Sequence, residues 1–493
     1  MTPTVERCLL GRDLSISRVL TGLWQIADME RDGRAVDLGD ASASMEPYVA
    51  AGFTTFDMAD HYGSAELVAG RYCERRGAGG AVQLCTKWVP KPGRVTRNDV
   101  REAVRRALHR LRVDSIDLLQ FHSWSYAHPG WLDALFFLQE MKQEGVVRNL
   151  GLTNFDTAHL RVAVASGIDV VSNQVSFSLL DQRAGGRMSE YCLAHGVKLL
   201  AYGTVGGGWL TEKWLGKDEP DWERTGTWSR MKYGRFIRAI GGWGALQRVL
   251  RTTVEIAKRH DVSIANVASR FILEHPAVGG IIIGARLGES EHIADNLRLF
   301  SFSLTVNDRA DIARALETLI PIPGDTGDEY RKPPFLTASG DLSHHLVAMS
   351  APYEVKSGGD GRICCSSGTP WERMAGYSRA VRSGNLIHVS GTTATHGDRF
   401  VGGSDPAAQM HFVIDKIEGA LQSLGGGLED VVRTRVFVRN IDDWEPIARA
   451  HGERFGAVLP ANTLVRAELV AEACLVEVEA EADVSGRDQR TGQ

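Results

Sequence analysis

The sequence has few cysteines, no excess of positive charge and no uncharged apolar run long enough to cross a bilayer. Its seven cysteines are scattered, without a CxxC pair or a Cys/His spacing typical of metal sites. Such an odd set favours a reducing compartment, so we expect a cytoplasmic protein without a signal peptide. The net charge of −5 argues against a nucleic-acid partner, whose phosphates would need neutralisation.

What is present is the composition of a globular protein, and 493 residues predict two or three domains. From residue 19 onward, short apolar or β-branched runs alternate with helical patterns. Eight runs are strand candidates: residues 19–24, 53–56, 82–86, 115–121, 146–152, 170–172, 198–201 and 280–283. This alternation predicts an α/β fold, a (β/α)8 TIM barrel. A doubly wound open sheet is the alternative, but the Gly-rich phosphate turn expected after its early strand is missing.

Local signals outside the strands are fewer. Residues 5–18 predict a short hairpin before the barrel. Residues 99–111 place apolar side chains on one helical face, with Thr96 as the N-cap, and residues 254–272 predict another helix.

The character of the chain changes after residue 319. Residues 320–366 are rich in Pro, Gly and Ser without periodicity, which predicts a linker between a barrel of residues 1–319 and a second domain of residues 367–486. The second domain has a β-αβαββ order, typical of a small α+β fold. Residues 487–493 are expected to form a disordered tail.

Polar side chains stand at or just after three consecutive strands of the predicted barrel. Asp57 ends one strand and Tyr62 follows on its loop, Lys87 ends the next strand, and His122 ends the third. A parallel barrel gathers these strand ends around one mouth, where active sites lie.

These four side chains suit carbonyl reduction, in which the carbonyl oxygen must receive a proton. A Tyr hydroxyl donates poorly at its ordinary pKa near 10. A Lys ammonium at about 4 Å would favour the phenolate by roughly 4 kcal/mol, or about 3 pKa units, so Lys87 should bring Tyr62 toward neutrality. Asp57 would be the counter-ion of Lys87, and His122 would hold the carbonyl oxygen by a hydrogen bond.

The motifs FTTFDMADHYGSAE, CTK, LLQFHSW and GLTNF resemble the aldo-keto reductase family over roughly residues 5–319. The resemblance implies a barrel that binds a nicotinamide cofactor, with Asp57, Tyr62, Lys87 and His122 as the catalytic tetrad. It also implies that Thr153, Asn154 and Gln174 hold the carboxamide and that Tyr202 stacks on the nicotinamide ring.

The segment GARLGESEHIADN resembles the part of the family that binds the adenosine phosphate. The residues implied there are Gly284, Arg286, His292, Asp295 and Asn296. Arg286 would meet a 2′-phosphate, which favours NADP(H) and leaves NAD(H) possible. His292 departs from the Arg common at its position.

Only aromatic residues in the sequence indicate where a substrate would bind. Trp24, Trp88 and Trp124 are expected to line the mouth, although packing accounts equally well for Trp88. Residues 203–242 carry further Trp and Tyr side chains, which suggest a lid over a sugar-like or ring-bearing carbonyl compound.

In the second domain, HVSGTT, TRVFVRNIDDW, RFGAVLPANTLV and LVEVEAEA resemble the Rid/YjgF family of reactive-intermediate deaminases. The resemblance implies a homotrimer with ligand pockets between subunits, and Tyr377, Ser390, Asn462 and Glu477 match pocket positions. Asn462 replaces the Arg that binds the substrate carboxylate in active deaminases, which argues against imine or enamine deamination. A ligand-binding or trimerising module and a different small-molecule hydrolase are the readings left open.

Together these patterns predict a cytoplasmic NADP-dependent aldo-keto reductase that acts on a small carbonyl compound or the matching alcohol. A Rid-like domain is fused to it and would bind or process a related molecule. We expect a homotrimer without nucleic-acid, membrane or metal partners. The alternative is a cofactor-binding sensor that carries the same Rid-like module.

Overall fold

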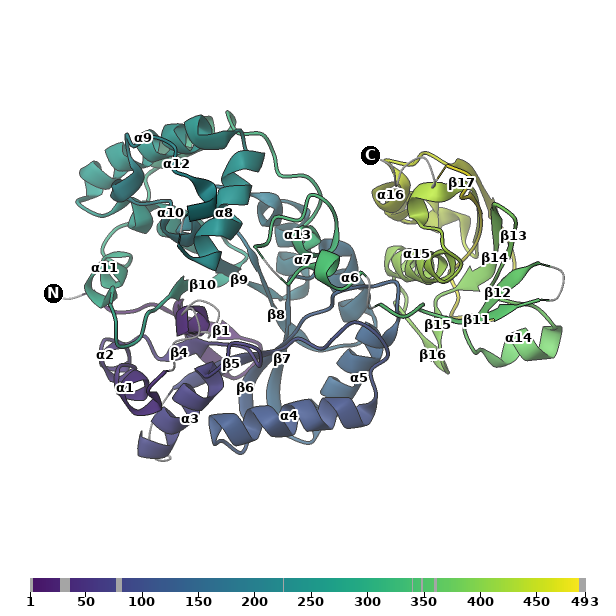
Figure 1. Cartoon of the computed structure of the whole chain (residues 1–493), viewed down its shortest axis with the longest axis horizontal. Helices are drawn as coiled ribbons and strands as arrows, with labels where there is room; N and C mark the ends of the chain where they lie inside the picture. Colours follow the sequence, from purple (N-terminus) through teal and green to yellow (C-terminus); the bar gives the residue numbers. More distant parts are fainter. Residues whose placement is uncertain are drawn as a thin grey trace.

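The computed structural model describes residues 3–26, 36–76, 82–224, 226–338, 340–346, 349–358 and 361–486. The chain forms a large barrel domain and a smaller α+β domain beside it (Figure 1). The predicted tail of residues 487–493 lies outside the described residues.

Eight parallel strands close the barrel, in the order β10-β3-β4-β5-β6-β7-β8-β9, which confirms the predicted TIM barrel. The strands are β3 (Val19–Gly22), β4 (Thr55–Asp57), β5 (Gln83–Trp88), β6 (Ile116–Phe121), β7 (Val147–Thr153), β8 (Val170–Ser176), β9 (Lys198–Tyr202) and β10 (Val278–Gly284). The predicted hairpin is present as β1 (Arg7–Leu10) and β2 (Leu14–Ser17). Its buried Leu10 and Ile16 pack with Leu118 and Leu200 of the barrel interior.

The barrel helices surround this sheet (Figure 1). They are α1 (Leu38–Ala43), α2 (Glu46–Ala50), α3 (Ala65–Arg76), α4 (Arg97–Leu111), α5 (Gly130–Gln143), α6 (Thr157–Ala165), α7 (Arg187–His195), α8 (Trp228–Ala239), α9 (Gly242–His260), α10 (Ile264–Leu273), α11 (Ile293–Arg298) and α12 (Val306–Leu316). Thr96 caps α4 in a capping box, as predicted. The single helix predicted over residues 254–272 is wrong, because Asp261 turns left-handed with φ 51° and Ser263 caps a new helix.

The segment predicted as a linker contains elements that pack on both domains. Helix α13 (Asp328–Arg331) lies against the barrel, where Arg331 Nη1 donates to the Asn154 carbonyl at 2.6 Å and Nη2 donates to that of Ser123 at 2.6 Å. Strands β11 (Glu354–Ser357) and β12 (Ile363–Ser366) also fall within residues 320–366 and pair with the second domain's sheet.

The second domain is a seven-stranded sheet in the order β11-β12-β13-β14-β19-β17-β18, with helices packed on it. The remaining elements are α14 (Pro370–Ala375), β13 (Ala380–Ser383), β14 (Leu386–Thr393), β15 (Thr395–His396), β16 (Arg399–Phe400), α15 (Pro406–Ser423), β17 (Val431–Val438), α16 (Trp444–Phe455), β18 (Ala461–Arg466) and β19 (Val476–Asp483). In the described residues no helix is both long and apolar enough to cross a membrane.

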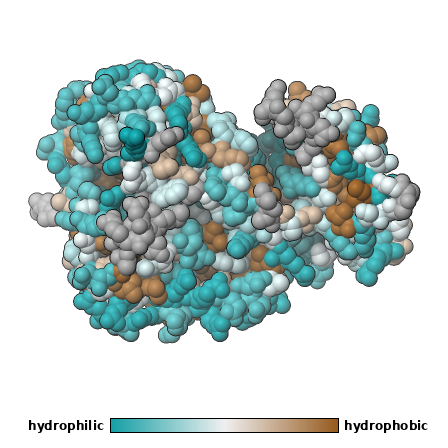
Figure 2. Space-filling model, viewed as in Figure 1, coloured by the Kyte–Doolittle hydropathy of each residue, from teal (hydrophilic) through white to brown (hydrophobic). Residues whose placement is uncertain are grey.

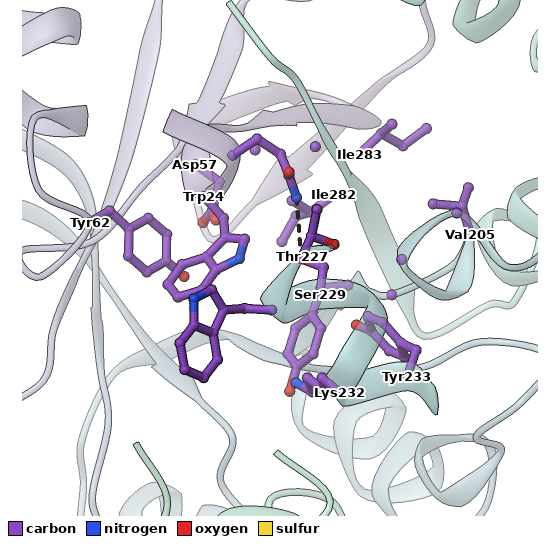
Figure 3. Close-up of a pocket in the computed structure, with 18 of the residues that line it drawn as sticks. Trp24, Asp57, Tyr62, Val205, Thr227, Ser229, Lys232, Tyr233, Ile282 and Ile283 are labelled. Carbon is purple, nitrogen blue, oxygen red and sulfur yellow. Dashed lines mark hydrogen bonds between the residues drawn. The ribbon is translucent and has the colours of Figure 1, made fainter. Parts of the chain in front are cut away.

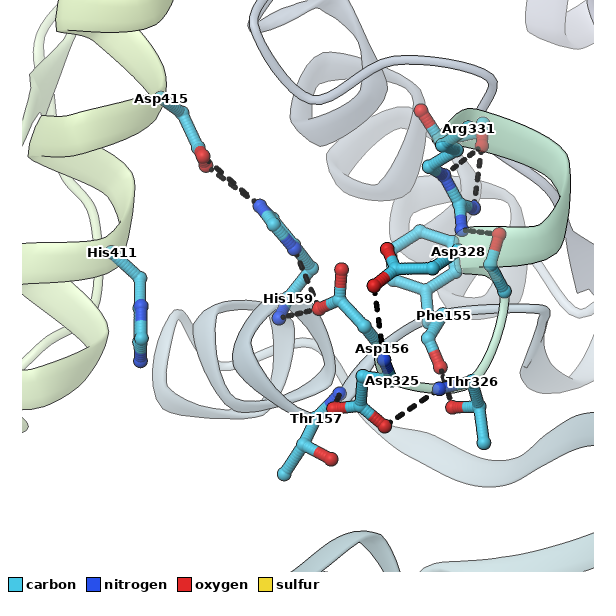
Figure 4. Close-up of polar contacts among 12 residues, drawn as sticks. Phe155, Asp156, Thr157, His159, Asp325, Thr326, Asp328, Arg331, His411 and Asp415 are labelled. Atoms are coloured by element: carbon cyan, nitrogen blue, oxygen red, sulfur yellow. Dashed lines mark hydrogen bonds and ion pairs between the residues drawn. The ribbon is translucent and has the colours of Figure 1, made fainter. Parts of the chain in front are cut away.

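The two domains meet where α15 packs against α6 of the barrel (Figure 4). His159 Nε2 lies 3.0 Å from both carboxylate oxygens of Asp415, and Arg161 Nε donates to Asp405 at 2.7 Å. The β15–β16 hairpin adds a second contact, because His396 Nε2 lies 2.8 Å from the Asp133 carboxylate. The domains are therefore joined by polar contacts as well as by the chain, and the His159–Asp415 contact among them is buried.

Candidate active site

A cavity of about 700 Å³ opens at the C-terminal ends of the barrel strands (Figure 3). All four residues of the predicted tetrad line it, so the structure brings Asp57, Tyr62, Lys87 and His122 together. The predicted cofactor residues line the same cavity: Thr153, Asn154, Gln174, Tyr202, Gly284, Arg286, His292, Asp295 and Asn296.

Asp57 and Lys87 form a buried ion pair at the base of the cavity. Asp57 ends β4 and Lys87 is the next-to-last residue of the neighbouring parallel strand β5; Lys87 Nζ donates to Asp57 Oδ2 at 2.6 Å. The other carboxylate oxygen accepts hydrogen bonds from the side-chain amides of Gln120 at 3.2 Å and Gln174 at 2.7 Å. With Lys87 also donating to the Met58 carbonyl at 2.9 Å, the pair is fixed in place.

Tyr62 lies above this pair, with its ring centre 5.2 Å from Lys87 Nζ and the Trp24 ring edge-on at 4.8 Å. Burial and then the Asp57 carboxylate raise the pKa of Tyr62 well above its ordinary value. The lowered pKa that we predicted is therefore wrong for this structure. The physical reason is that burial disfavours the phenolate and that the nearby Asp57 carboxylate repels it, so Tyr62 remains a neutral phenol that can donate a proton.

His122 is buried, and its Nδ1 lies 3.3 Å from the Thr153 carbonyl oxygen. Burial lowers the pKa of His122 well below its usual value, so the ring is neutral. Because a carbonyl oxygen only accepts, the proton in that hydrogen bond is on Nδ1 and Nε2 is an acceptor. Nε2 is buried without a hydrogen-bond partner. The predicted donor role toward a carbonyl oxygen does not fit this tautomer, whereas an alcohol hydroxyl would donate to it.

Hydrogen bonds fix several of the predicted cofactor residues in the cavity wall. The Tyr202 hydroxyl donates to Asn154 Oδ1 at 2.7 Å, and Asn154 has the left-handed φ of 58° that turns its side chain at the end of β7. Farther along, Asp295 accepts hydrogen bonds from Ser263 and Asn266 of α10.

The donor set and the cavity fit an extended nicotinamide dinucleotide. Amide and phenol groups line the cavity together with the predicted tetrad, and the exposed cation of Arg286 lines it as well. His122 Nε2 is a buried hydrogen-bond acceptor without a partner, so it is available to a ligand bound beside the tetrad.

Two of the three predicted substrate residues line the cavity. Trp24 and Trp124 do, but Trp88 does not: it is 6% exposed and packs in the core against Phe121. The aromatic lid is also only partly present. Trp228 and Tyr233 line the cavity, whereas the remaining tryptophans of this segment form their own cluster with Trp243: Trp209, Trp214 and Trp222.

Sequence reasoning missed the residues that the chain after the barrel adds to the cavity. Tyr330 of α13 lies 5.7 Å from the His122 ring, and Thr337 and Gly340 also line the wall. Lys232 of α8 was missed as well, although it lies among the aromatic residues of a segment expected to form a lid. For Tyr330 the sequence carries no periodic signal.

In the second domain, Arg379 forms hydrogen bonds with part of the predicted pocket. Its Nη2 donates to the Tyr377 hydroxyl at 3.2 Å, and its Nη1 donates to the Gly391 carbonyl at 2.8 Å beside Ser390. Burial raises the pKa of Glu477, whose carboxylate lies against Gly391.

Asn462 is not part of this group within one chain. It lies on β18, which β17 separates from the Glu477 strand, a spacing of about 10 Å across the sheet. Its side-chain amide instead donates to Thr434 of β17 at 2.9 Å.

The barrel matches the aldo/keto reductase family over residues 18–317, so the chain belongs to that family. Residues 370–484 match the family described as Endoribonuclease L-PSP, which confirms the Rid/YjgF resemblance of the second domain.

Individual relatives cover one domain each. The protein tas of Escherichia coli is 29% identical over 288 residues, 50% of this chain and 81% of its own. A glycerol dehydrogenase of Gluconobacter oxydans superposes with a TM-score of 0.54 at 20% identity, over 65% of this chain and 97% of its own, and shows the fold. A member of the YjgF/YER057c/UK114 family from Mycobacterium tuberculosis is 42% identical over 25% of this chain and 99% of its own, with a TM-score of 0.23.

Proposed function

We propose that the barrel is an NADP(H)-dependent reductase of an aldehyde or ketone, with Tyr62 as the general acid. The observation that carries this is the buried Asp57–Lys87 pair directly beneath Tyr62 at the end of a cavity that fits an extended dinucleotide. Bound there, the reduced cofactor would supply the hydride.

The residues of the chain supply the rest. Tyr62, neutral because burial and Asp57 raise its pKa, donates its proton to the carbonyl oxygen. The nearby Lys87 cation stabilises the phenolate that remains. His122 Nε2 then accepts a hydrogen bond from the new hydroxyl and orients the alcohol. In the oxidative direction the Tyr62 phenolate would act as the base and take the proton of the alcohol hydroxyl.

We propose that NADP(H) is preferred to NAD(H). Arg286 is exposed and lines the cavity, as do Ser290 and His292. A guanidinium gains more from a 2′-phosphate than from the hydroxyl pair of NAD, because it binds the doubly charged group with parallel hydrogen bonds.

The decisive experiment is the Tyr62→Phe variant of the full chain, tested on aldehydes, ketones and aldoses with NADPH. We expect turnover to fall about 10²- to 10⁴-fold while NADPH affinity is kept. Tyr191→Phe, on α7 and outside the cavity, is the matched control and should retain turnover. Tight NADPH binding by a parent that turns over nothing would instead support the sensor alternative.

We propose that the second domain is a trimerising, ligand-binding module and that the protein works in the cytoplasm. Asn462 can join Tyr377 and Glu477 only from another copy, because a strand separates them within one chain. Figure 2 shows apolar side chains gathered on this domain. Its exposed apolar residues include Val432, Leu459, Val465 and Val470. All seven cysteines are free, as a reducing compartment requires.

Light scattering on the full chain tests the assembly. We expect three times the mass of one chain. Replacing Val465 by Asp should lower that mass, because a charge would be buried at the interface. A monomer for the parent would contradict the proposal.

A further inference from the structure

Lys232 occupies an unusual position in the barrel cavity. It extends from helix α8 into the cavity wall, across from Tyr62 (Figure 3). Its Nζ donates to the Tyr330 hydroxyl at 2.8 Å. Three tyrosine rings surround the ammonium, with ring centres at 4.6 Å for Tyr202, 4.9 Å for Tyr330 and 5.6 Å for Tyr233.

The charge of Lys232 is retained without a direct ion pair. Burial disfavours the ammonium, but the tyrosine hydroxyls and the Glu329 carboxylate outweigh it and raise the pKa of Lys232. Among the described residues no carboxylate lies within ion-pair distance of its Nζ. Glu329 is bound instead by Arg183, at 2.9 Å, which also binds Asp181 at 2.8 Å. Lys232 is therefore a cation with capacity for an anionic ligand.

Tyr330 lies between the Lys232 ammonium and the predicted catalytic residue His122. Its ring centre lies 5.7 Å from that of His122 and 6.4 Å from that of Trp124, while its hydroxyl meets Lys232. The ring thus spans the distance between the reacting end of the cavity and the ammonium.

Contacts of the residues on either side of Tyr330 hold helix α13 against the barrel, so the position of the Tyr330 side chain in the cavity wall is fixed. Arg331, the next residue, donates to the carbonyls of Asn154 and Ser123 and lies over the Tyr126 ring at 4.5 Å. On the other side, Glu329 pairs with Arg183. Tyr330 lies beyond residues 18–317, so this wall comes from a part of the chain outside the matched reductase residues.

We infer that Lys232 and the Tyr330 hydroxyl bind the carboxylate of the substrate, so that the barrel reduces a carbonyl compound that carries an acid group. An ammonium and a phenol both donate hydrogen bonds to a carboxylate, and the half-buried setting strengthens them. One tyrosine side chain separates the ammonium from His122, so several bonds should separate the acid from the reacting carbonyl. This favours an ω-oxo acid or an aromatic carboxy-aldehyde over a 2-oxo acid.

The inference rests on the proposed reductase function, and the cofactor is a second source of anionic groups. Lys232 lies over the Tyr202 ring, which the sequence resemblance assigns to the nicotinamide, so the cofactor's phosphates would reach Lys232 only if the dinucleotide lay differently in the cavity. NADPH affinity therefore distinguishes the two sources.

The experiment compares 4-carboxybenzaldehyde with its methyl ester as substrates of the full chain. We expect a higher kcat/KM for the acid, which Lys232→Met lowers about 10- to 100-fold while the ester and NADPH affinity are unaffected. Lys232→Arg should keep the preference, and Tyr330→Phe should lose a smaller part of it. Lys213→Met is the matched control: this exposed lysine lies on Trp214 outside the cavity and should change neither substrate.

Equal losses for acid and ester, or a loss of NADPH affinity with Lys232→Met, would overturn the inference. A readout independent of turnover is calorimetric binding of 4-(hydroxymethyl)benzoate to the chain in the presence of NADP. Binding that Lys232→Met weakens supports the subsite even if no carbonyl is reduced, in which case only the reductase function fails. Equal binding by the parent and Lys232→Met rejects the subsite.

Discussion

His159 of the barrel and Asp415 of the second domain form a buried ion pair across the domain interface, with Nε2 3.0 Å from each carboxylate oxygen (Figure 4). On the other side of the ring, Nδ1 lies 2.6 Å from Asp156, and the ring stacks on Tyr126 at 3.4 Å. Asp156 follows the Asn154 loop directly. The contact between the domains is therefore made immediately behind the predicted cofactor wall.

Breaking this pair should destabilise the protein strongly. His159→Gln leaves the Asp415 charge buried beside Arg454 alone, and we expect a loss of about 3–5 kcal/mol in the free energy of unfolding. Urea denaturation measures it. Arg449→Gln, which breaks the exposed Arg449–Glu445 pair on α16, is the control and should cost no more than about 0.5 kcal/mol. Similar losses for both variants would contradict the assignment.

The stability of the interface should depend on pH. Burial opposes the His159 cation, but Asp156 and Asp415 outweigh it and raise its pKa, so this contribution is complete below about pH 6.5 and is lost as the pH rises through the folded-state value. For Asp415, burial is outweighed by His159 and Arg454, which lower its pKa; that contribution is present above about pH 4 and is lost as the pH falls. The free energy of unfolding should therefore be highest between about pH 4 and about pH 6.5. Its decline at higher pH should be absent in His159→Gln.

The catalytic tetrad could be predicted because its members follow consecutive strands. Asp57, Lys87 and His122 occur where apolar runs end. A parallel barrel brings these strand ends together, independently of the conformation of the loops. Trp88 directly follows Lys87 on β5, so its side chain leaves the opposite face of the strand and packs against Phe121 instead of lining the cavity.

The rest of the site depends on contacts between distant segments without local signals. Lys232 and Tyr330 are 98 residues apart, and His159 and Asp415 are 256 apart. Nothing in the Pro- and Gly-rich segment marks Tyr330 as a cavity residue. The pKa of Tyr62 does not follow from its pairing with Lys87 alone, because burial and then the Asp57 carboxylate raise it.

Arg286 should determine cofactor preference. We expect Arg286→Ala to weaken NADP(H) binding by about 1.5–3 kcal/mol, the range for a hydrogen bond to a charged group, and to leave NAD(H) binding unchanged. Fluorescence titration of the reduced cofactors measures both. Arg298→Ala, on α11 but outside the cavity and paired with Asp261, is the control and should change neither. An equal loss for both cofactors would assign Arg286 to the shared pyrophosphate instead.

Gly327 tests whether the segment after the barrel supports the cofactor wall. It is buried with φ 82°, and a methyl group there would overlap the Asn154 carbonyl oxygen and Arg331. Gly327→Ala should therefore displace α13 from the Asn154 loop, destabilise the fold by about 1–3 kcal/mol and weaken NADPH binding. Gly145→Ala is the matched control, because Gly145 has a φ of 80° with no atom near the added methyl. Its cost is backbone strain alone, so NADPH affinity should be that of the parent. If both variants bind NADPH equally, the wall at Asn154 does not depend on α13, and the segment's contribution to the cavity is confined to Tyr330.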